Sequence, residues 1–250
     1  MGRIVVEGIE FLFNKLYQNG SETDEIAVNM FYKNKLLTYV EMETVTIINH
    51  DAFNYCSNLS TAIFKNVRVL GPLAFGGCGF KTIDISNVVS IGDYCFGACL
   101  NLETIILNDE ITEIGFGAFN NCQQLSSIHL PENLEKLGER AFYNCKKLYI
   151  EKLPENLKTI GVGAFYSVEK LAITQLPKQV NIISDFCFEK CYGLTNLTLG
   201  GVGYPVITIG NSPFYDCPNL KKLTIYTANG QPLAGAPWGA VNATITYLPA

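Results

Sequence analysis

The sequence has little charge and few of the residues that catalytic or metal sites need. Only 16% of its 250 residues are charged, and its 18 Lys and Arg do not cluster, so neither nucleic acid nor an anionic membrane is an expected partner. No apolar run approaches the ~18 residues that cross a bilayer, so membrane insertion is not expected. The two histidines have no Asp, Ser or Cys at a fixed partner spacing. We therefore expect no catalytic residues, no metal site and no cofactor.

The first 16 residues also lack the unbroken apolar stretch of a signal peptide, because Glu7 and Glu10 interrupt them. Two explanations stand. Either the protein is not exported by this route, or a leader is missing from the sequence as given.

What the sequence does contain is a repeat. Residues 114–131 read I-G-F-G-A-F-N-N-C-Q-Q-L-S-S-I-H-L-P, and residues 137–154 read L-G-E-R-A-F-Y-N-C-K-K-L-Y-I-E-K-L-P. The repeat Phe returns every 21 to 26 residues, with a Cys three residues later and a Leu three further in most units. The repeat Phe positions are Phe31, Phe53, Phe75, Phe96, Phe119, Phe142, Phe165, Phe188 and Phe214. Such a period is typical of a solenoid, in which neighbouring coils bury each other's apolar residues.

Each unit also predicts its own local structure. An alternating segment such as Leu102, Ile105 and Leu107 indicates a strand, and a second apolar pair indicates a shorter one. A Gly four residues before most repeat Phe residues suggests a backbone angle that only Gly adopts freely. The A-F-x-x-C segment is expected to form a helical turn, too short to be stable without packing.

Nine cysteines raise the alternatives of disulfides or a metal site. Seven stand three residues after the repeat Phe, and Cys95 and Cys187 stand one residue before it. Equivalent positions stack in a ladder, where disulfides would need a specific geometry at every step. The spacings to Cys99 and Cys191 lack a second pair or a nearby His, which disfavours zinc. We therefore expect small buried thiols.

The two ends depart from the repeat. Residues 1–25 are expected to form an N-terminal capping segment, residues 26–227 a solenoid of about eight to nine coils, and residues 228–250 a C-terminal cap. The only Trp, Trp238, is expected to close the C-terminal coil. The alternative is an exposed Trp that serves as a ligand platform.

The outward positions of the predicted strands form two neighbouring columns, which are the candidate binding face. These residues are Thr61, Ile63, Thr82, Asp84, Thr104, Ile106, Ser127, His129, Ile150, Lys152, Ile173, Gln175, Asn196 and Thr198. The four isoleucines favour a recognition surface, because they are apolar where water is expected. A solvated sheet that tolerates Thr and Ile for their strand preference explains the same columns. The face is poor in Trp, Tyr and Arg, so any binding is expected to be weak or multivalent.

The pattern A-F-x-x-C-x-x-L-x-x-I-x-L-P resembles the BspA-type leucine-rich repeat, also described in a Treponema surface protein. The likeness spans residues 26–227, and its departures include Val168 for Cys and Asn49 and Ser184 for Gly. It implies an α/β repeat fold: a right-handed, curved leucine-rich-repeat solenoid, β-rich with short helical turns on one side.

The resemblance also implies a function. Such proteins are often displayed on bacterial surfaces, where they bind host proteins or other cells, and the family has no known catalytic residues. We therefore expect a non-enzymatic adhesion module whose partner is a host matrix or cell-surface protein. The alternative is a structural component of a larger assembly, such as a prophage tail or a multidomain surface protein. The oligomeric state is left open.

Overall fold

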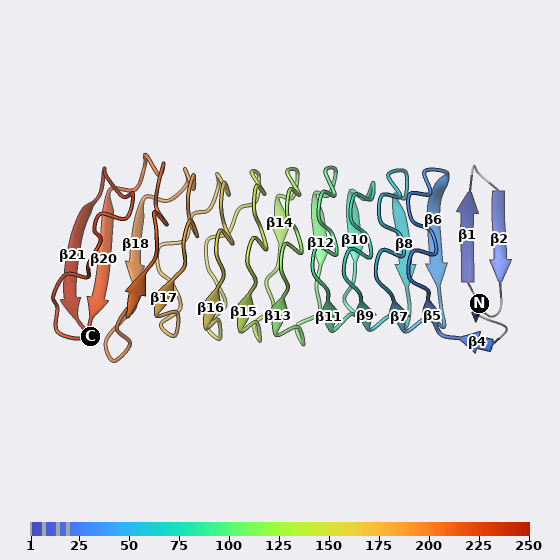
Figure 1. The fold of residues 1–250 in the computed structure, drawn as a ribbon, viewed down its shortest axis with the longest axis horizontal. Helices are drawn as coiled ribbons and strands as arrows, with labels where there is room; N and C mark the ends of the chain where they lie inside the picture. Colours follow the sequence, from blue (N-terminus) through green and yellow to red (C-terminus); the bar gives the residue numbers. More distant parts are fainter. Residues whose placement is uncertain (1, 7–8, 14–15, 19–20) are drawn as a thin grey trace.

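The chain forms a solenoid of stacked coils that lie side by side along one long axis (Figure 1). The computed structural model describes residues 2–6, 9–13, 16–18 and 21–250. Residues 1, 7–8, 14–15 and 19–20, all in the predicted N-terminal cap, lie outside the described residues. The predicted β-rich solenoid of stacked coils is confirmed, and equivalent strands of successive coils pair in parallel over most of its length.

In most coils the strand that follows the repeat Phe and Leu contributes to the first strand row. Its members are β6 (Leu37–Met42), β8 (Thr61–Phe64), β10 (Thr82–Asp84), β12 (Thr104–Ile106), β14 (Ser127–Ile128), β18 (Asn196–Leu199), β20 (Lys222–Thr227) and β21 (Thr244–Pro249). Pairing keeps the repeat in register, so that Thr82 lies beside Thr104 and Thr104 beside Ser127. We call the exposed side of this row the strand face.

A second row of two-residue strands follows the bend of each coil. It comprises β5 (Glu25–Ile26), β7 (Ile47–Ile48), β9 (Val69–Leu70), β11 (Ser90–Ile91), β13 (Glu113–Ile114), β15 (Lys136–Leu137), β16 (Thr159–Ile160), β17 (Ile182–Ile183) and β19 (Thr208–Ile209). In most of these strands the second residue is buried and the first is at least partly exposed, so the second row closes the core from another side.

Antiparallel strands precede the first coil. Strand β1 (Gly2–Val6) pairs with β2 (Ile9–Phe13) and also, antiparallel, with β6 of the first strand row. Strands β3 (Leu16–Gln18) and β4 (Ser21–Thr23) form a separate antiparallel pair. The hairpin thus lies on the edge of the first coil.

The repeat Phe side chains form one continuous stack through the core. Neighbouring rings lie 5.0–5.8 Å apart between centroids, with planes within 12° of parallel. From Phe53 to Phe214 every ring of the stack has 0% exposed surface, and only Phe31, at the end, is half-buried. Offset-parallel aromatic pairs at this distance add to the gain from burial alone, so the stack binds coil to coil.

The prediction that the A-F-x-x-C segments form helical turns is wrong. The A-F-x-x-C segments are non-helical turns, and the described residues contain no helix. The reason is local: in most coils the residues two before and two after the repeat Phe have left-handed φ angles, such as 58° at Gly117 and 60° at Asn121. Only three residues with right-handed φ remain between them, too few to propagate a helix.

The interpretation of the repeated Gly also needs correction. Gly92, Gly138 and Gly161 do not have left-handed φ angles. Instead, a Cβ added to Gly138 would lie 2.7 Å from the backbone of Gly115 in the preceding coil. These glycines are therefore required by the close approach of successive backbones. Ser184 replaces this Gly in one coil. Its hydroxyl donates a hydrogen bond to the nearby Ile160 carbonyl of the preceding coil at 2.6 Å.

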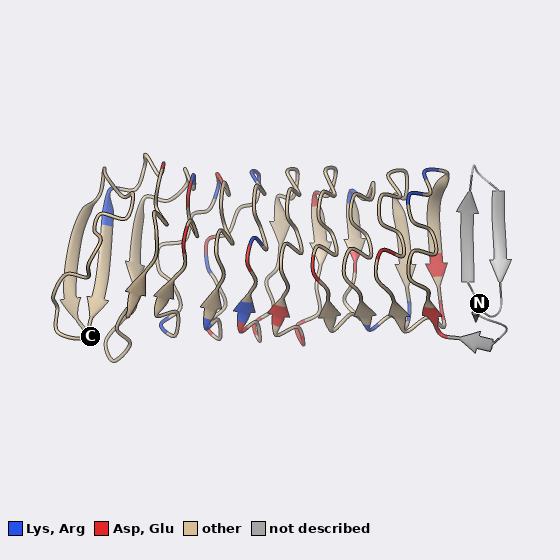
Figure 2. Cartoon of the chain, in the orientation of Figure 1, with Lys and Arg blue, Asp and Glu red and all other residues tan. Residues whose placement is uncertain are grey.

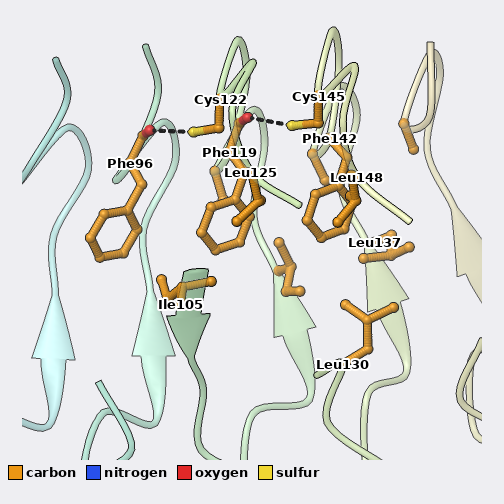
Figure 3. Close-up of a cluster of buried hydrophobic side chains, with 14 of the residues drawn as sticks. Phe96, Ile105, Phe119, Cys122, Leu125, Leu130, Leu137, Phe142, Cys145 and Leu148 are labelled. Atoms are coloured by element: carbon orange, nitrogen blue, oxygen red, sulfur yellow. Dashed lines mark hydrogen bonds between the residues drawn. The ribbon is translucent and has the colours of Figure 1, made fainter. Parts of the chain in front are cut away.

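The nine cysteines are all free and buried. The seven that follow the repeat Phe donate their thiols to the carbonyl of the preceding coil's Phe, as Cys122 does to Phe96 at 3.1 Å and Cys145 to Phe119 at 3.1 Å (Figure 3). Burial raises the pKa of the Cys99 thiol to about 12, so it stays protonated as a donor at neutral pH. These thiols act as small core residues that also tie successive coils together.

Candidate functional site

The strand face carries most of the residues that the sequence assigned to it. Exposed members are Thr61, Ile63, Thr82, Asp84, Ile106, Ser127, His129, Lys152, Gln175 and Asn196, while Thr104 and Thr198 are half-buried. Strand pairing keeps the members in register within β6–β8, within β10–β12–β14 and within β18–β20–β21, because each coil advances the pattern by one repeat. Coils far apart in sequence therefore contribute to one face.

Its N-terminal half exposes two large apolar side chains. Ile63 on β8 is 41% exposed, and Ile106 on β12 is 50% exposed. Asp84 on β10 lies directly beside Ile106 in the register of the sheet. Isolated exposed apolar residues are ordinary on protein surfaces, but two on one strand face beside a carboxylate form a patch that a partner could cover.

The assignment of two residues, Ile150 and Ile173, to the exposed face is wrong. Ile150 is 5% exposed and Ile173 is 1% exposed, so both belong to the core. In most other coils the inward residue of this segment, such as Ile105, lies nine residues after the repeat Phe; the coil of Phe75 is one residue shorter, and its inward residue is Ile83. Ile150 and Ile173 come only eight residues after the repeat Phe, and each apolar side chain turns inward to fill the same space.

This shift interrupts the first strand row. The segments 148–153 and 171–176 contain no strand, although strands flank them on both sides. Among the described residues, no backbone hydrogen bond joins 127–130 to 149–153. Between the two strandless segments the Ala172 N–H donates to the Ile150 carbonyl at 2.9 Å, and a bridge between Gln175 and Thr198 restores the pairing. The strand ladder is therefore open between 127–130 and 149–153.

Two hollows lie over this break. One, of about 260 Å³, is lined by residues that include His129, Tyr149 and Lys152. The other, of about 700 Å³, is lined by residues that include Lys152, Gln175 and Lys178. The structure thus brings three residues of the predicted face together around depressions on an otherwise flat surface.

The break exposes three residues that the sequence reasoning missed. Tyr149 is 53% exposed, and Glu151 and Thr174 are also exposed where other coils bury an aliphatic residue. The sequence contained a signal for this change. In these two coils an isoleucine stands eight residues after the repeat Phe and a polar residue nine after it, whereas most other coils have a polar residue first and an aliphatic residue second. Assigning faces by a fixed offset concealed it.

Charge on the solenoid is balanced locally. Figure 2 shows basic and acidic segments interspersed along the described coils. On the face, Lys152 pairs with Glu155 at 3.2 Å and His129 lies 3.7 Å from Asp109, both in exposed settings where ion pairs contribute little. Within the described residues, no group of three His, Cys, Asp or Glu side chains could hold a metal ion. No helix there has the length and hydropathy of a membrane span.

The sequence matches a family profile described as the BspA type leucine rich repeat region. Six copies of the repeat are found, over residues 24–149 and 113–230. A search of curated proteins finds no match.

Solved bacterial structures share the fold. A leucine-rich repeat protein from Bacteroides ovatus is 25% identical, with a TM-score of 0.66 over 87% of this chain, which spans 63% of that protein. A leucine-rich repeat protein of T. pallidum is 26% identical, with a TM-score of 0.53 over 73% of this chain and 83% of that protein. The pneumococcal vaccine antigen PcpA, at 16% identity, has a TM-score of 0.53 over 88% of this chain and 73% of that protein.

Proposed function

Because the chain belongs to the BspA type leucine-rich repeat family, we propose that it is a non-enzymatic module that binds a protein partner through its strand face. The family is a repeat scaffold, and the residues that recur from repeat to repeat, such as the Phe and the Leu, are buried in the core. Function must then reside in side chains that vary from coil to coil on the surface. The bacterial cell surface is the setting that the family resemblance implies, with a host matrix or cell-surface protein as partner.

The observation that carries this proposal is the exposure of Ile63 and Ile106 on the same strand face as the hollows beside Lys152. A solvated sheet has no need of large apolar residues at these positions, since the equivalent outward positions elsewhere are polar. The extended faces of solenoids are commonly used for binding. With no Trp or Arg among the predicted members of the face, many modest contacts would share the binding energy.

The test is binding of the purified protein to immobilised matrix proteins, with fibronectin, fibrinogen, laminin and collagen as the panel. The double variant Ile106→Glu/Lys152→Glu should weaken the observed interaction by about tenfold or more, because a charge replaces an apolar contact and another charge is reversed.

A matched control is available on the second strand row. Ile182 is 54% exposed, and Lys158 forms a surface ion pair with Glu135 as Lys152 does with Glu155. The double variant Ile182→Glu/Lys158→Glu should bind as the original protein does. Equal binding by both folded double variants would exclude the strand face.

A further inference from the structure

The turn side of the solenoid, away from the strand face, carries a hollow that has no charged residue in its lining. It has a volume of about 170 Å³ and spans the coils of Phe53, Phe75, Phe96 and Phe119. Its walls include Tyr55 and Tyr94, and its base includes Gly76 and Gly77. We call it the tyrosine–glycine hollow.

The sequence explains why the surface dips here. The two residues that follow the repeat Phe are Gly76-Gly77 in one coil and Gly97-Ala98 in the next, whereas every other coil has at least one larger side chain at these positions. Two successive coils therefore carry nothing larger than a methyl group at these positions. The larger residues of the coils on either side stand above them.

The tyrosine rings lie against glycine backbone. A Cβ added to Gly77 would lie 2.9 Å from Cδ1 of Tyr55, and one added to Gly117 would lie 2.4 Å from Cε1 of Tyr94. Tyr55 keeps 50% of its surface exposed, and Tyr94 is partly exposed. On other sides the Lys33 amine lies 6.0 Å from the Tyr55 ring centroid and the Phe116 ring packs edge-on against Tyr94 at 4.8 Å, and both tyrosines line the hollow.

A buried amide oxygen faces the floor. Asn54 is only 4% exposed, and its side-chain NH2 donates to the Asp51 carboxylate. Among the described residues no donor reaches its Oδ1, which would lie 2.6 Å from a Cβ on Gly76. Asn120, at the other end of the hollow, accepts from Asn121 through Oδ1 at 2.7 Å, and its own NH2 has no acceptor within the described chain. The hollow thus offers one acceptor and one donor.

We propose that the tyrosine–glycine hollow binds a single neutral sugar ring of a glycan chain. A pyranose presents C–H groups that pack on aromatic faces and hydroxyls that both donate and accept. One hydroxyl would donate to Asn54 Oδ1 and another would accept from Asn120. The lack of charge in the lining favours a neutral unit, and the volume lies below the ~300 Å³ of pockets for drug-sized ligands, as suits one ring.

Aromatic grooves also take proline-rich peptides, so the two occupants must be distinguished. A proline ring packs on tyrosine but has no N–H or O–H to donate. It would leave the buried Asn54 oxygen without a partner, which costs free energy. The observations therefore favour the sugar. The site lies on a different side of the solenoid from the strand face, so it is independent of the protein-binding proposal.

The experiment is titration calorimetry of the purified protein with four neutral hexasaccharides: cellohexaose, maltohexaose, mannohexaose and chitohexaose. At least one should bind. Tyr55→Ala removes a wall, and Ala98→Gln fills the hollow from an exposed position that already carries a Cβ. Each should lower the affinity at least about tenfold.

The matched control is Tyr215→Ala, because Tyr215 is 55% exposed and belongs neither to the hollow nor to the strand face. This variant should keep the original affinity, and the far-UV circular dichroism of all three variants should match that of the original protein. Failure of all four sugars to bind, or undiminished binding by both folded hollow variants, would overturn the proposal. So would loss of sugar affinity in Tyr215→Ala alone, or binding of a polyproline peptide in place of every sugar.

Discussion

The Phe stack makes a quantitative prediction about stability. Replacing Phe142 by Ala should be among the most damaging single changes, because its ring has 0% exposed surface and lies between two others. The Phe142 centroid is 5.4 Å from that of Phe119 and 5.8 Å from that of Phe165, with planes tilted by 6° and 11°. The truncation would open a cavity that coils on both sides border.

The expected magnitude follows from three contributions. Burial of a Phe side chain is worth about 1.5–3 kcal/mol. Each aromatic pair adds about 0.5–1.5 kcal/mol, and Phe142 makes two. The sum agrees with the about 3–5 kcal/mol measured for Phe→Ala changes in other cores. The matched control is Phe31→Ala: Phe31 is half-buried and, among the residues the structure describes, its ring stacks only on Phe53, so its loss should cost about 1–2 kcal/mol.

Urea denaturation followed by two signals gives the measurement. Far-UV circular dichroism reports the whole solenoid, and fluorescence of the only Trp, Trp238, reports the C-terminal coil. Because stability in a repeat array is carried by interfaces between neighbours, Phe142→Ala should lower the dichroism midpoint more than the fluorescence midpoint. A loss below about 1 kcal/mol, or equal losses for Phe142→Ala and Phe31→Ala, would refute the reasoning.

Two further predictions concern the turns and the thiols. Gly117→Ala should lower the melting temperature more than Gly163→Ala does. Both glycines have φ near 58°, but only a Cβ at position 117 would lie against the Tyr94 ring. Equal melting temperatures would contradict the close approach of the Gly117 backbone to Tyr94. Native protein should not react with a thiol reagent such as DTNB until it unfolds, because burial raises the pKa of Cys56 to about 11 and of Cys99 to about 12. These raised values favour the folded state below the ~8.5 of an unfolded thiol, so urea midpoints should fall as pH rises from about 8 to about 10; a flat profile would be inconsistent with buried thiols.

Much of the fold could be predicted because one repeated sequence pattern specifies the contacts between neighbouring coils. A Phe, a Cys and two or three aliphatic residues per unit specify which side chains face the core, and stacking follows from the period. The local conformation of the A-F-x-x-C turn could not be read in the same way. Residues such as Arg140 and Phe186 give no sign of left-handed φ, which neighbouring coils impose on them.

The candidate site was predictable only where the pattern is regular. Ile63 and Ile106, ten residues after the repeat Phe, occupy the expected outward positions, whereas Ile150 and Ile173, assigned to the neighbouring column eight residues after it, are buried. An isoleucine alone does not show whether its side chain faces the core or the solvent. The neighbouring residue decides the direction: Glu151 and Thr174 are polar where most other coils place an inward aliphatic residue. Inward packing of the isoleucine then outweighs continuation of the strand, because burying the side chain gains about 1.5–3 kcal/mol, whereas one ladder hydrogen bond contributes only about 0.5–1.5 kcal/mol.

The two proposed surfaces are the places where the repeat changes without loss of the core. At the break in the first strand row, the core is refilled by a neighbouring isoleucine, and the altered residues Tyr149, Glu151 and Thr174 all face outward. At the tyrosine–glycine hollow, Phe75 and Phe96 stay in the stack at 5.7 Å while the residues after them shrink to glycine and alanine. A departure that keeps every buried contact gains no stability from its surface residues. Binding is the physical role left for side chains so placed, which is why the experiments above target these two surfaces.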